Sequence, residues 1–253
     1  MARIIAIANQ KGGVAKTTTA VNLCACLAEL GKKVLLLDLD PQGNATSGYG
    51  VIKDKLNYCI YDVLINDIPV KQVILKTEVK DLWIIPARIE LAGAEIELVN
   101  LKERDKKLSY ALKAVQEDYE FVIIDCPPSL GLLTLNALGA ATDILIPIQC
   151  EYYALEGLSL LMSTLDRVKK GLNPNLNILG VLLTMFDART NLSIQVVDEV
   201  KKYFRNKVFH TIVPRNVRLS EAPSHGKPIV IYDPKSKGAD VYRDLAEEVL
   251  ERA

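Results

Sequence analysis

Apolar residues along the chain fall into two alternating patterns. Short, continuous runs of β-branched and leucine residues are typical of strands buried on both faces, and they predict strands at 3–9, 33–39, 82–86, 121–125, 144–148, 178–185 and 208–213. Longer segments with helical spacing of apolar residues predict helices at 16–30, 91–117, 129–140, 154–170, 191–205 and 237–252. The alternation predicts an α/β fold with a doubly wound, mostly parallel central sheet and helices on both faces.

Composition is that of an ordinary globular chain, with 253 residues of which 49% are hydrophobic and 25% are charged. No repeat, low-complexity tract or linker interrupts it, so we expect residues 1–253 to form one domain. The formal net charge is zero, which excludes a general electrostatic attraction to nucleic acid or anionic membrane. Any such binding has to come from a local patch.

Five cysteines are present, an odd number without the spacing of a metal site. Cys24 and Cys26 lie two positions apart on a predicted helix and therefore point to different faces. We expect free, buried thiols in a reducing cytosol. The chain begins directly with a strand-like run, so no signal peptide is expected, and no apolar run approaches the roughly 18 residues of a membrane span.

Glycine and lysine residues follow the first predicted strand and precede a helix, which is the setting of a phosphate-binding loop. Glycines allow backbone N–H groups to approach phosphate oxygens, and the helix N-terminus adds partial positive charge. Lys16 can reach the β- and γ-phosphates, and the Thr17 hydroxyl can bind magnesium. The general pattern is not met, because Gln10 and Ala15 occupy its glycine positions. The alternative interpretation is a glycine turn between surface lysines. The predicted nucleotide-binding residues are Lys11, Gly12, Gly13, Val14, Ala15, Lys16, Thr17 and Thr18.

Two predicted strands end in carboxylates. The strand at 33–39 leads to Asp38 and Asp40, and the strand at 121–125 ends at Asp125. A carboxylate at the carboxyl edge of a parallel sheet, beside a phosphate loop, can hold the shell of a magnesium ion or a nucleophilic water. Aspartates also simply begin turns, but two on the loop's side of the sheet favour the functional interpretation.

These motifs resemble those of the ParA/Soj partition ATPases, within the wider group that includes MinD and the nitrogenase iron protein. The resemblance extends over essentially the whole chain. It includes K-G-G-V-A-K-T-T at 11–18, D-L-D-P-Q-G-N-A-T at 38–46 and I-I-D-C-P-P-S-L-G at 123–131. It continues in Q-C-E-Y-Y-A-L-E-G-L at 149–158, P-R-N-V-R-L-S-E-A at 214–222 and S-H-G-K-P at 224–228.

The resemblance implies a role for individual residues, with ATP and Mg²⁺ as cofactors. Lys11 matches the signature lysine that crosses a dimer interface to the partner's nucleotide, and Lys16, Thr17 and Thr18 match the phosphate and magnesium contacts. Asp40 matches the residue that supports water attack, and Asp125 the second carboxylate on the magnesium side. Pro214 and Asn216 match the segment around adenine. The implied catalytic set is Lys11, Lys16 and Asp40, and the implied metal ligands are Thr17 and Asp125.

The resemblance also implies a function. Members form ATP-sandwich homodimers that bind double-stranded DNA without sequence preference, and a ParB-type partner stimulates hydrolysis and releases the DNA. It implies a cytoplasmic, nucleoid-associated protein without stable membrane association, and suggests the replication initiator DnaA as a further partner. Ala15 departs from the family's usual glycine. A left-handed backbone there would be strained and could weaken nucleotide binding or hydrolysis.

A basic region extends from Ser163 to Arg218, where ten basic residues stand against four acidic ones for a net charge of +6. Such a region is a candidate for binding the DNA backbone, although a solvated helix face would look the same. On the helix at 191–205, Val196, Val200 and Phe204 form an apolar stripe that leaves the basic residues off it. Within this region we expect Arg189 and Arg218 to contact DNA.

Three alternative functions can be weighed. A MinD-like membrane ATPase should end in a basic amphipathic helix, but the tail from Asp240 is acidic. An iron–sulfur reductase would present cysteines at a dimer axis, for which Cys126 is the one candidate. A metabolic ligase or kinase would need acid–base residues of its own, and we expect both histidines, His210 and His225, to be structural.

Overall fold

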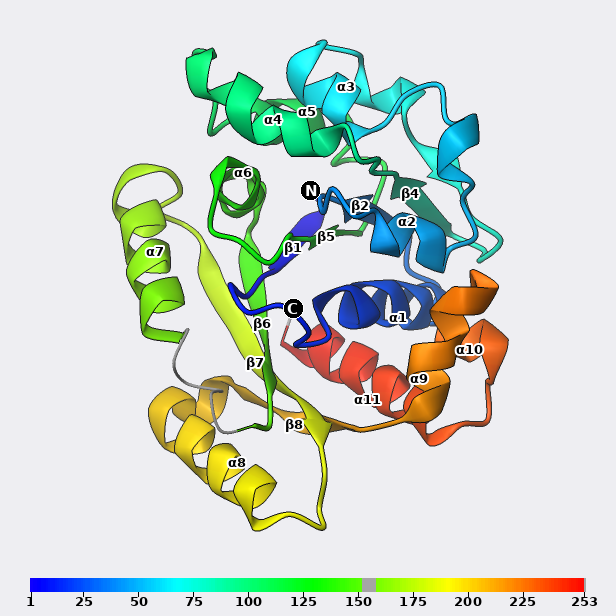
Figure 1. Cartoon of the computed structure of the whole chain (residues 1–253), viewed down its shortest axis with the longest axis vertical. Helices are drawn as coiled ribbons and strands as arrows, with labels where there is room; N and C mark the ends of the chain where they lie inside the picture. The colour runs from blue at the N-terminus through cyan, green and yellow to red at the C-terminus, as the bar shows by residue number, and fades with distance from the viewer. Residues whose placement is uncertain (152–157, 253) are drawn as a thin grey trace.

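A computed structural model describes residues 1–151 and 158–252. Its centre is a sheet of eight strands in the order β3-β4-β2-β5-β1-β6-β7-β8 (Figure 1). All neighbouring strands run parallel except the antiparallel pair β3 and β4. The strands are β1 (Arg3–Ile7), β2 (Val34–Asp38), β3 (Leu75–Lys76), β4 (Leu82–Ile85), β5 (Phe121–Asp125), β6 (Asp143–Gln149), β7 (Asn177–Phe186) and β8 (Val208–Pro214). The predicted α/β fold with a mostly parallel sheet is confirmed.

Helices cover both faces of the sheet. On one face lie α1 (Lys16–Glu29), α2 (Asn44–Gly48), α9 (Val217–Glu221), α10 (Ile229–Tyr232) and α11 (Lys237–Glu251). On the other lie α3 (Ile60–Ile65), α4 (Leu91–Glu97), α5 (Lys107–Lys113), α6 (Leu132–Ala140), α7 (Leu158–Gly171) and α8 (Asn191–Phe204). Short 3₁₀ helices are η1 (Lys53–Lys55), η2 (Val70–Gln72), η3 (Leu98–Asn100), η4 (Arg205–Lys207) and η5 (Ala222–His225).

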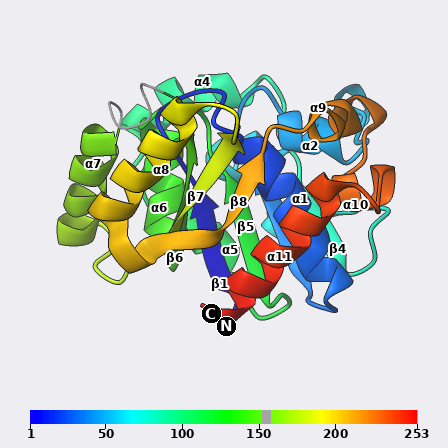
Figure 2. The ribbon, with the colours of Figure 1, turned by 90° about the horizontal axis from the view of Figure 1, so that it is seen from below.

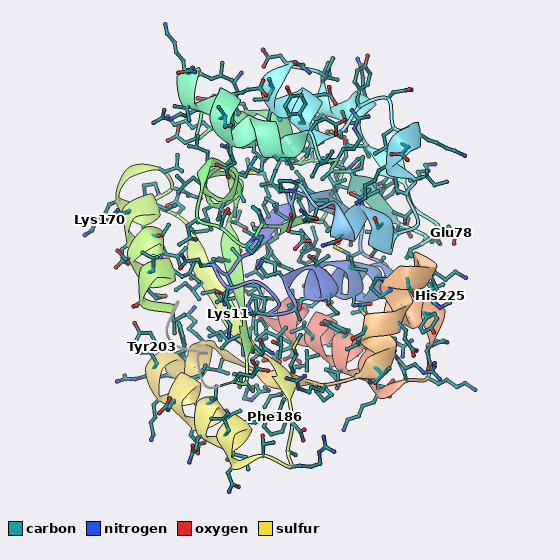
Figure 3. The ribbon with its side chains drawn as sticks, in the orientation of Figure 1. Lys11, Glu78, Lys170, Phe186, Tyr203 and His225 are labelled. Atoms are coloured by element: carbon teal, nitrogen blue, oxygen red, sulfur yellow. The ribbon has the colours of Figure 1, made fainter. Side chains whose placement is uncertain are left out.

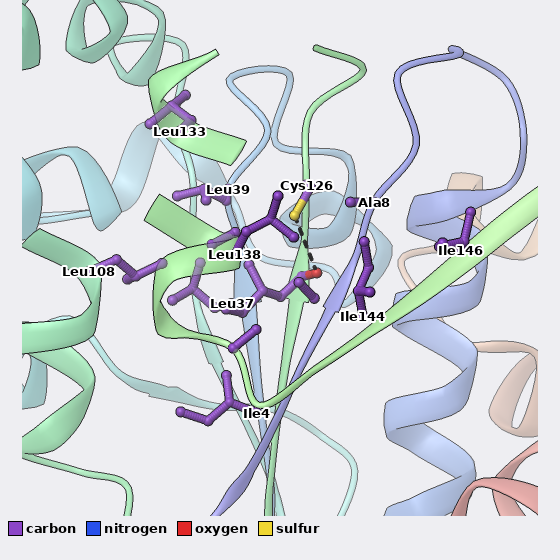
Figure 4. Packing of buried hydrophobic residues seen from close by; sticks show 14 of the residues in the cluster. Ile4, Ala8, Leu37, Leu39, Leu108, Cys126, Leu133, Leu138, Ile144 and Ile146 are labelled. Carbon is purple, nitrogen blue, oxygen red and sulfur yellow. Dashed lines mark hydrogen bonds between the residues drawn. The ribbon is translucent and has the colours of Figure 1, made fainter. Parts of the chain in front are cut away.

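The core forms on both sides of the sheet because successive strand residues point to opposite faces. In β1, Ile4 packs toward α5 and α6, whereas Ile5 packs toward α1 and α11. Figure 4 shows the first of these two clusters, in which Leu37 and Ile144 from the sheet meet Leu138 of α6. The continuous apolar runs in the sequence therefore have two buried faces to fill.

The single helix predicted at 91–117 is wrong. The structure has α4, η3 and α5 there, with residues 101–106 between them outside any helix. Glu103 has φ of +51°, which a right-handed helix does not allow, and the run Lys102–Lys107 carries no apolar residue to hold a helix on the sheet. The elements β3, α2, α3, α9 and α10, of two to six residues, had not been predicted because they are too short to show a period. The first four residues of the helix predicted at 154–170 lie outside the described residues.

The parallel arrangement brings several strand ends to one edge. Asp38 at the end of β2 is the register partner of Asp125 at the end of β5, and Asp125 is also paired with Ile7 at the end of β1. In Figure 2 the strands point toward the top, where α2 and α9 lie. Residues far apart in the sequence therefore meet at this edge, as is usual for ligand sites of doubly wound sheets.

Candidate active site

The loop between β1 and α1 is anchored at both ends to neighbouring strands. At its start the Asn9 amide donates to the Pro147 carbonyl at 2.7 Å, and the Asn9 side-chain oxygen accepts from the Lys11 N–H at 3.0 Å. Further on, the Thr184 hydroxyl of β7 donates to the Val14 carbonyl at 3.1 Å. The loop is thus held in place by β6 and β7 before any ligand is considered.

Ala15 has a left-handed backbone conformation, the one that would be strained for a residue with a Cβ. Its φ is +67° and its ψ is +31°, and Gly13 in the same loop has φ of +74°. Glycine adopts this region without strain, whereas a side chain with a Cβ costs roughly 1–2 kcal/mol. The Ala15 carbonyl accepts the Thr19 N–H at 2.9 Å, so the strained residue also begins α1.

Lys16 begins α1 and is 6% exposed. Its ammonium group donates to the Lys11 carbonyl at 2.9 Å, so the side chain folds back over the loop. Burial lowers the pKa of Lys16, and the nearby charge of Asp125 acts against that change. An ammonium group in this position can neutralise a phosphate that enters the loop.

Asp38 ends β2 and Asp40 lies two residues further on, but the two carboxylates have different surroundings. Asp38 accepts the backbone N–H and the hydroxyl of Thr46, both at 2.7 Å, and the Asp40 N–H at 3.2 Å. Burial raises the pKa of Asp38 to about 6 in spite of these hydrogen bonds. Asp40 lines the cavity beside the phosphate loop, and one of its oxygens accepts the Gln42 N–H at 2.9 Å. Asp38 therefore positions Asp40, which is the carboxylate facing the cavity.

Asp125 is fully buried, yet neither of its carboxylate oxygens has a hydrogen-bond partner among the described residues. Burial raises its pKa well above the usual range, and the neighbouring Asp38 adds to that effect. A buried carboxylate without partners is unfavourable unless a cation balances it. Its oxygens and the nearby Thr17 hydroxyl are hard donors of the kind that Mg²⁺ prefers.

The chemistry of these donors fits a magnesium ion for which the protein supplies only some of the ligands. Among residues 1–151 and 158–252 no group of three or more His, Cys, Asp or Glu side chains is placed to hold a metal. Mg²⁺ commonly keeps several waters and is bound by one or two protein groups together with substrate phosphates. Thr17 and Asp125 are donors of this kind, and their role as metal ligands stays a prediction.

Two cavities meet at the phosphate loop. The first, of about 340 Å³, is lined by the loop and by Asp40, Gln42, Asn44 and Pro128. The second, of about 440 Å³, is lined by the end of β8, by α9 and by Tyr242, and it includes Pro214 and Asn216. Ala15, Thr18 and Met185 line both cavities. The first has the polar lining of a phosphate site, and the second offers Val213, Leu219 and Tyr242 to a flat apolar group such as a purine.

The structure brings the predicted adenine residues, Asp40 and most of the predicted phosphate-loop residues together at these two cavities. Asp125 is buried close to Lys16 and Thr17 and lines neither cavity. Two of the loop residues line neither cavity: Val14 is buried, and Lys11 is partly exposed. Lys11 is labelled in Figure 3, and no carboxylate of the described residues lies within 4.0 Å of its ammonium group. Asn216 uses its side-chain oxygen to cap α9, accepting the Arg218 N–H at 2.8 Å.

Sequence reasoning missed several lining residues. Met185 and Pro128 could have been found, because Met185 ends one predicted strand and Pro128 lies three residues after another, at the carboxyl edge where ligands bind. Tyr242 could not, because its ring comes from the middle of α11, where an apolar residue indicates only a buried face. Its hydroxyl lies 3.3 Å from the Thr19 hydroxyl of α1.

The two arginines expected to contact DNA both have acidic partners. Arg189 precedes α8, is 88% exposed and binds Asp187 through two hydrogen bonds of 2.9 and 2.7 Å, and it also lines the second cavity. Arg218 in α9 is 56% exposed and lies 3.0 Å from Glu221 and 3.5 Å from Asp233. The charge of each arginine is thus partly balanced, and their contact with DNA stays a prediction.

A family model described as an AAA domain matches residues 2–178. The chain is 64% identical over 249 residues to the sporulation initiation inhibitor protein Soj of Bacillus subtilis, covering 98% of both chains. It is 57% identical over 250 residues to the chromosome partitioning protein ParA of Myxococcus xanthus, covering 99% of this chain and 88% of that one. The chain belongs to the Soj/ParA family of chromosome-partitioning ATPases. As a Soj/ParA protein it has the ATP-binding P-loop fold.

A solved structure is similar over nearly the whole Soj/ParA chain. It is described as cobyrinic acid a,c-diamide synthase from Mycobacterium smegmatis with bound ADP and magnesium, and it matches with a TM-score of 0.88 and 41% identity. The match covers 99% of this chain and 95% of that one. A nucleotide and magnesium are thus present in a protein of the same fold.

The observations also bear on the alternative functions. None of the described helices is both long and apolar enough to cross a membrane. All five cysteines are buried, as expected, and the Cys126 thiol lies 3.9 Å from the Ile124 carbonyl inside the core. Burial raises the pKa of Cys126, which disfavours the thiolate that an iron–sulfur cluster requires.

Proposed function

We propose that this Soj/ParA protein acts as one domain that binds ATP, forms an ATP-sandwich homodimer, binds double-stranded DNA without sequence preference and leaves the DNA after hydrolysis. A ParB-type partner would stimulate that hydrolysis, which is slow without it. The protein would act in the cytoplasm on the nucleoid, without stable membrane association, with the initiator DnaA as a further partner. The unpartnered Asp125 carboxylate beside Lys16 and Thr17 is the observation that carries the ATPase part of the proposal.

In this proposal the residues in and behind the first cavity have separate tasks. The loop N–H groups and Lys16 bind the phosphates, and Thr17 and Asp125 hold Mg²⁺, which neutralises phosphate charge when bound. Asp40 lies in the cavity and orients the water that attacks the γ-phosphate. Asp38 holds the Asp40 backbone in place through its 3.2 Å hydrogen bond. Pro214 and Asn216 border the adenine.

Lys11 supports the dimer part of the proposal. Lys11 does not line the first cavity, whereas the Lys16 ammonium group lies over the loop, 2.9 Å from the Lys11 carbonyl. A second lysine outside the cavity can neutralise phosphate charge only from across an interface, in the partner's site. ATP, with its γ-phosphate, should therefore stabilise the dimer where ADP does not.

The basic region supports the DNA part. In α8 the stripe of Val196, Val200 and Phe204 is buried, and Lys201 and Lys202 are exposed. In the described part of the chain no carboxylate lies within 4.0 Å of either lysine. Figure 3 shows Lys170 at the end of α7 pointing away from the molecule. Phosphate contacts require only exposed cations in suitable positions, and Arg189 and Arg218 remain the predicted individual contacts.

Sedimentation of the protein with ATP or ADP and magnesium tests the dimer. We expect a dimer with ATP only, and we expect Lys11→Ala to abolish it while ATP still binds to the monomer. Lys76→Ala, which removes an exposed lysine on the edge strand β3, should behave as wild type. An unchanged ATP dimer in Lys11→Ala would remove Lys11 from the trans role.

Asp40→Ala separates binding from hydrolysis. Loss of a residue that orients the attacking water should lower the rate at saturating ATP by about 100-fold or more, with ATP affinity preserved. The ATP dimer should then persist on DNA, and sedimentation with DNA measures that persistence. Collapse of ATP affinity instead would place Asp40 in the binding site.

The DNA contacts are tested by titrating salt. Binding of unrelated duplexes should require ATP and weaken steeply with salt, and removal of the Arg189 or Arg218 side chain should weaken all duplexes alike and make the salt dependence shallower. A changed sequence preference would indicate base contacts.

A further inference from the structure

Two of the three residues that line both cavities have a strained backbone. Ala15 has φ of +67° and Met185 has φ of +52°, and neither is glycine. Such conformations persist only where surrounding contacts hold them, and they cluster at functional sites. The residue next to Met185 is Thr184, whose side chain makes a contact with the loop that carries Ala15.

Thr184 is fully buried in β7, and its hydroxyl donates to the Val14 carbonyl at 3.1 Å across 170 residues of sequence. That carbonyl belongs to the peptide unit between Val14 and Ala15. Because Val14 is also buried, the hydroxyl is well protected from competing water. On its other side Ala15 is fixed by the hydrogen bond from the Thr19 N–H to its carbonyl.

The geometry of this peptide unit sets the conformation of Ala15. Ala15 can leave the left-handed region only if the Val14–Ala15 peptide rotates, and that rotation turns the Val14 carbonyl away from Thr184. The same rotation turns the Ala15 N–H, one of the groups of the phosphate loop. The hydrogen bond from Thr184 contributes about as much free energy as the left-handed conformation of Ala15 costs, and it therefore opposes this rotation.

We propose that Thr184 is a positioning residue for nucleotide binding, which holds the Val14–Ala15 peptide and thereby keeps the alanine of the phosphate loop in its left-handed conformation. The inference rests on the proposed nucleotide site. It predicts a dependence on residue 15: with glycine there, the left-handed conformation carries no strain and the hydrogen bond is dispensable.

A double-mutant cycle tests this, with the dissociation constant of ATP and magnesium as the readout. Thr184→Val keeps the shape and removes the hydroxyl, and it should weaken ATP binding about fivefold to tenfold. Thr184→Ser retains the hydroxyl and should stay within about twofold of wild type. In the background of Ala15→Gly, Thr184→Val should have an effect below about twofold.

Thr142→Val is the matched control, because its hydroxyl also lies within hydrogen-bond distance of a neighbouring strand, 2.9 Å from the Ile4 carbonyl and 2.9 Å from an Asp143 oxygen, but just before the amino end of β6. It should leave ATP affinity unchanged. An equal loss from Thr184→Val with alanine or glycine at position 15 would overturn the proposal, as would no loss, or a tenfold loss in Thr184→Ser. A wild-type protein that binds no ATP would instead overturn the proposed function.

Discussion

Asp125 and Asp143 are both buried aspartates at strand ends, but they lie at opposite edges of the sheet. Asp143 begins β6 and accepts four hydrogen bonds, two from Arg3 at 2.9 and 3.1 Å and one each from Thr142 and Asn177. Burial acts to raise the pKa of Asp143, but these donors bring it below its usual value. Asp125 ends β5 and has no such donors in the described part of the chain.

The difference separates a carboxylate that serves stability from one that serves a ligand. The charge of Asp143 is balanced by groups of the chain itself, so this carboxylate needs no ligand. Asp125 is left with its desolvation uncompensated, which lowers stability and prepares a site for a cation. Identical residue types, buried to within 5% of each other, thus have opposite roles because of the partners around them.

The largest expected effect is on activity. Asp125→Asn should lower the magnesium-dependent ATPase rate by about 100-fold or more, because the neutral amide no longer binds the metal that stabilises the transition state. Asp143→Asn should leave the rate within about twofold. Steady-state ATPase assays below the melting temperature of each variant measure both, and similar losses in the two variants would show that the comparison is wrong.

The free energy of unfolding should be affected more by the change at Asp143 than by the change at Asp125. Asp143→Asn leaves the Arg3 guanidinium with a weaker partner in a mostly buried position and should lower the free energy of unfolding by about 3 kcal/mol. Asp125→Asn removes an uncompensated carboxylate and should change it by less than about 1 kcal/mol, or raise it. Urea denaturation in buffer without magnesium provides the values. A large destabilisation by Asp125→Asn would mean that its carboxylate has stabilising partners.

The pH dependence of stability should show the same contrast. Asp38 has a folded pKa of about 6, above its unfolded value near 4, so the folded chain holds more protons between those values. The free energy of unfolding should therefore fall as the pH rises from 4 to 6, by on the order of 2 kcal/mol from this group. Asp143 has a lowered pKa in the folded protein. It therefore adds to the free energy of unfolding at a pH above its unfolded pKa, and this contribution is lost as the pH falls through its folded pKa.

Difference curves between wild type and variants isolate these contributions in magnesium-free buffer. Asp38→Asn should reduce the fall between pH 4 and 6 and leave the part that the raised pKa of Asp125 contributes, whereas Asp143→Asn should leave that fall and remove the loss at more acidic pH. A wild-type curve that rises from pH 4 to 6, with no difference from Asp38→Asn, would contradict the raised pKa of Asp38.

The smallest effect is expected at Ala15. Glycine removes strain of roughly 1–2 kcal/mol but costs about 0.4–1 kcal/mol through the greater freedom of the unfolded chain. Ala15→Gly should therefore raise the free energy of unfolding by up to about 1 kcal/mol. ATP affinity, ATP-dependent dimerisation and hydrolysis measured beside it show whether the strain also falls on the nucleotide-bound state, and equal values in all assays would make Ala15 a neutral variation.

The sequence alone was sufficient for what depends on local pattern. The seven main strands, the loop at 11–18 and the carboxylates Asp38, Asp40 and Asp125 could be located because a buried strand needs a continuous apolar run and a parallel sheet collects its strand ends at one edge. The pattern failed at 91–117, where apolar residues at helical spacing did not show that Glu103 turns the backbone out of a helix.

Only the tertiary structure decided which of these groups have partners. The sequence places Asp125 at the end of one predicted strand and Asp143 just before another, but only the strand order β2-β5-β1-β6-β7 surrounds one with Asp38 and Lys16 and the other with Arg3 and Asn177. The bond from Thr184 to the Val14 carbonyl likewise joins segments 170 residues apart. Local propensity arises from each residue and its near neighbours, whereas burial, charge balance and backbone strain depend on contacts that exist only once the sheet has assembled.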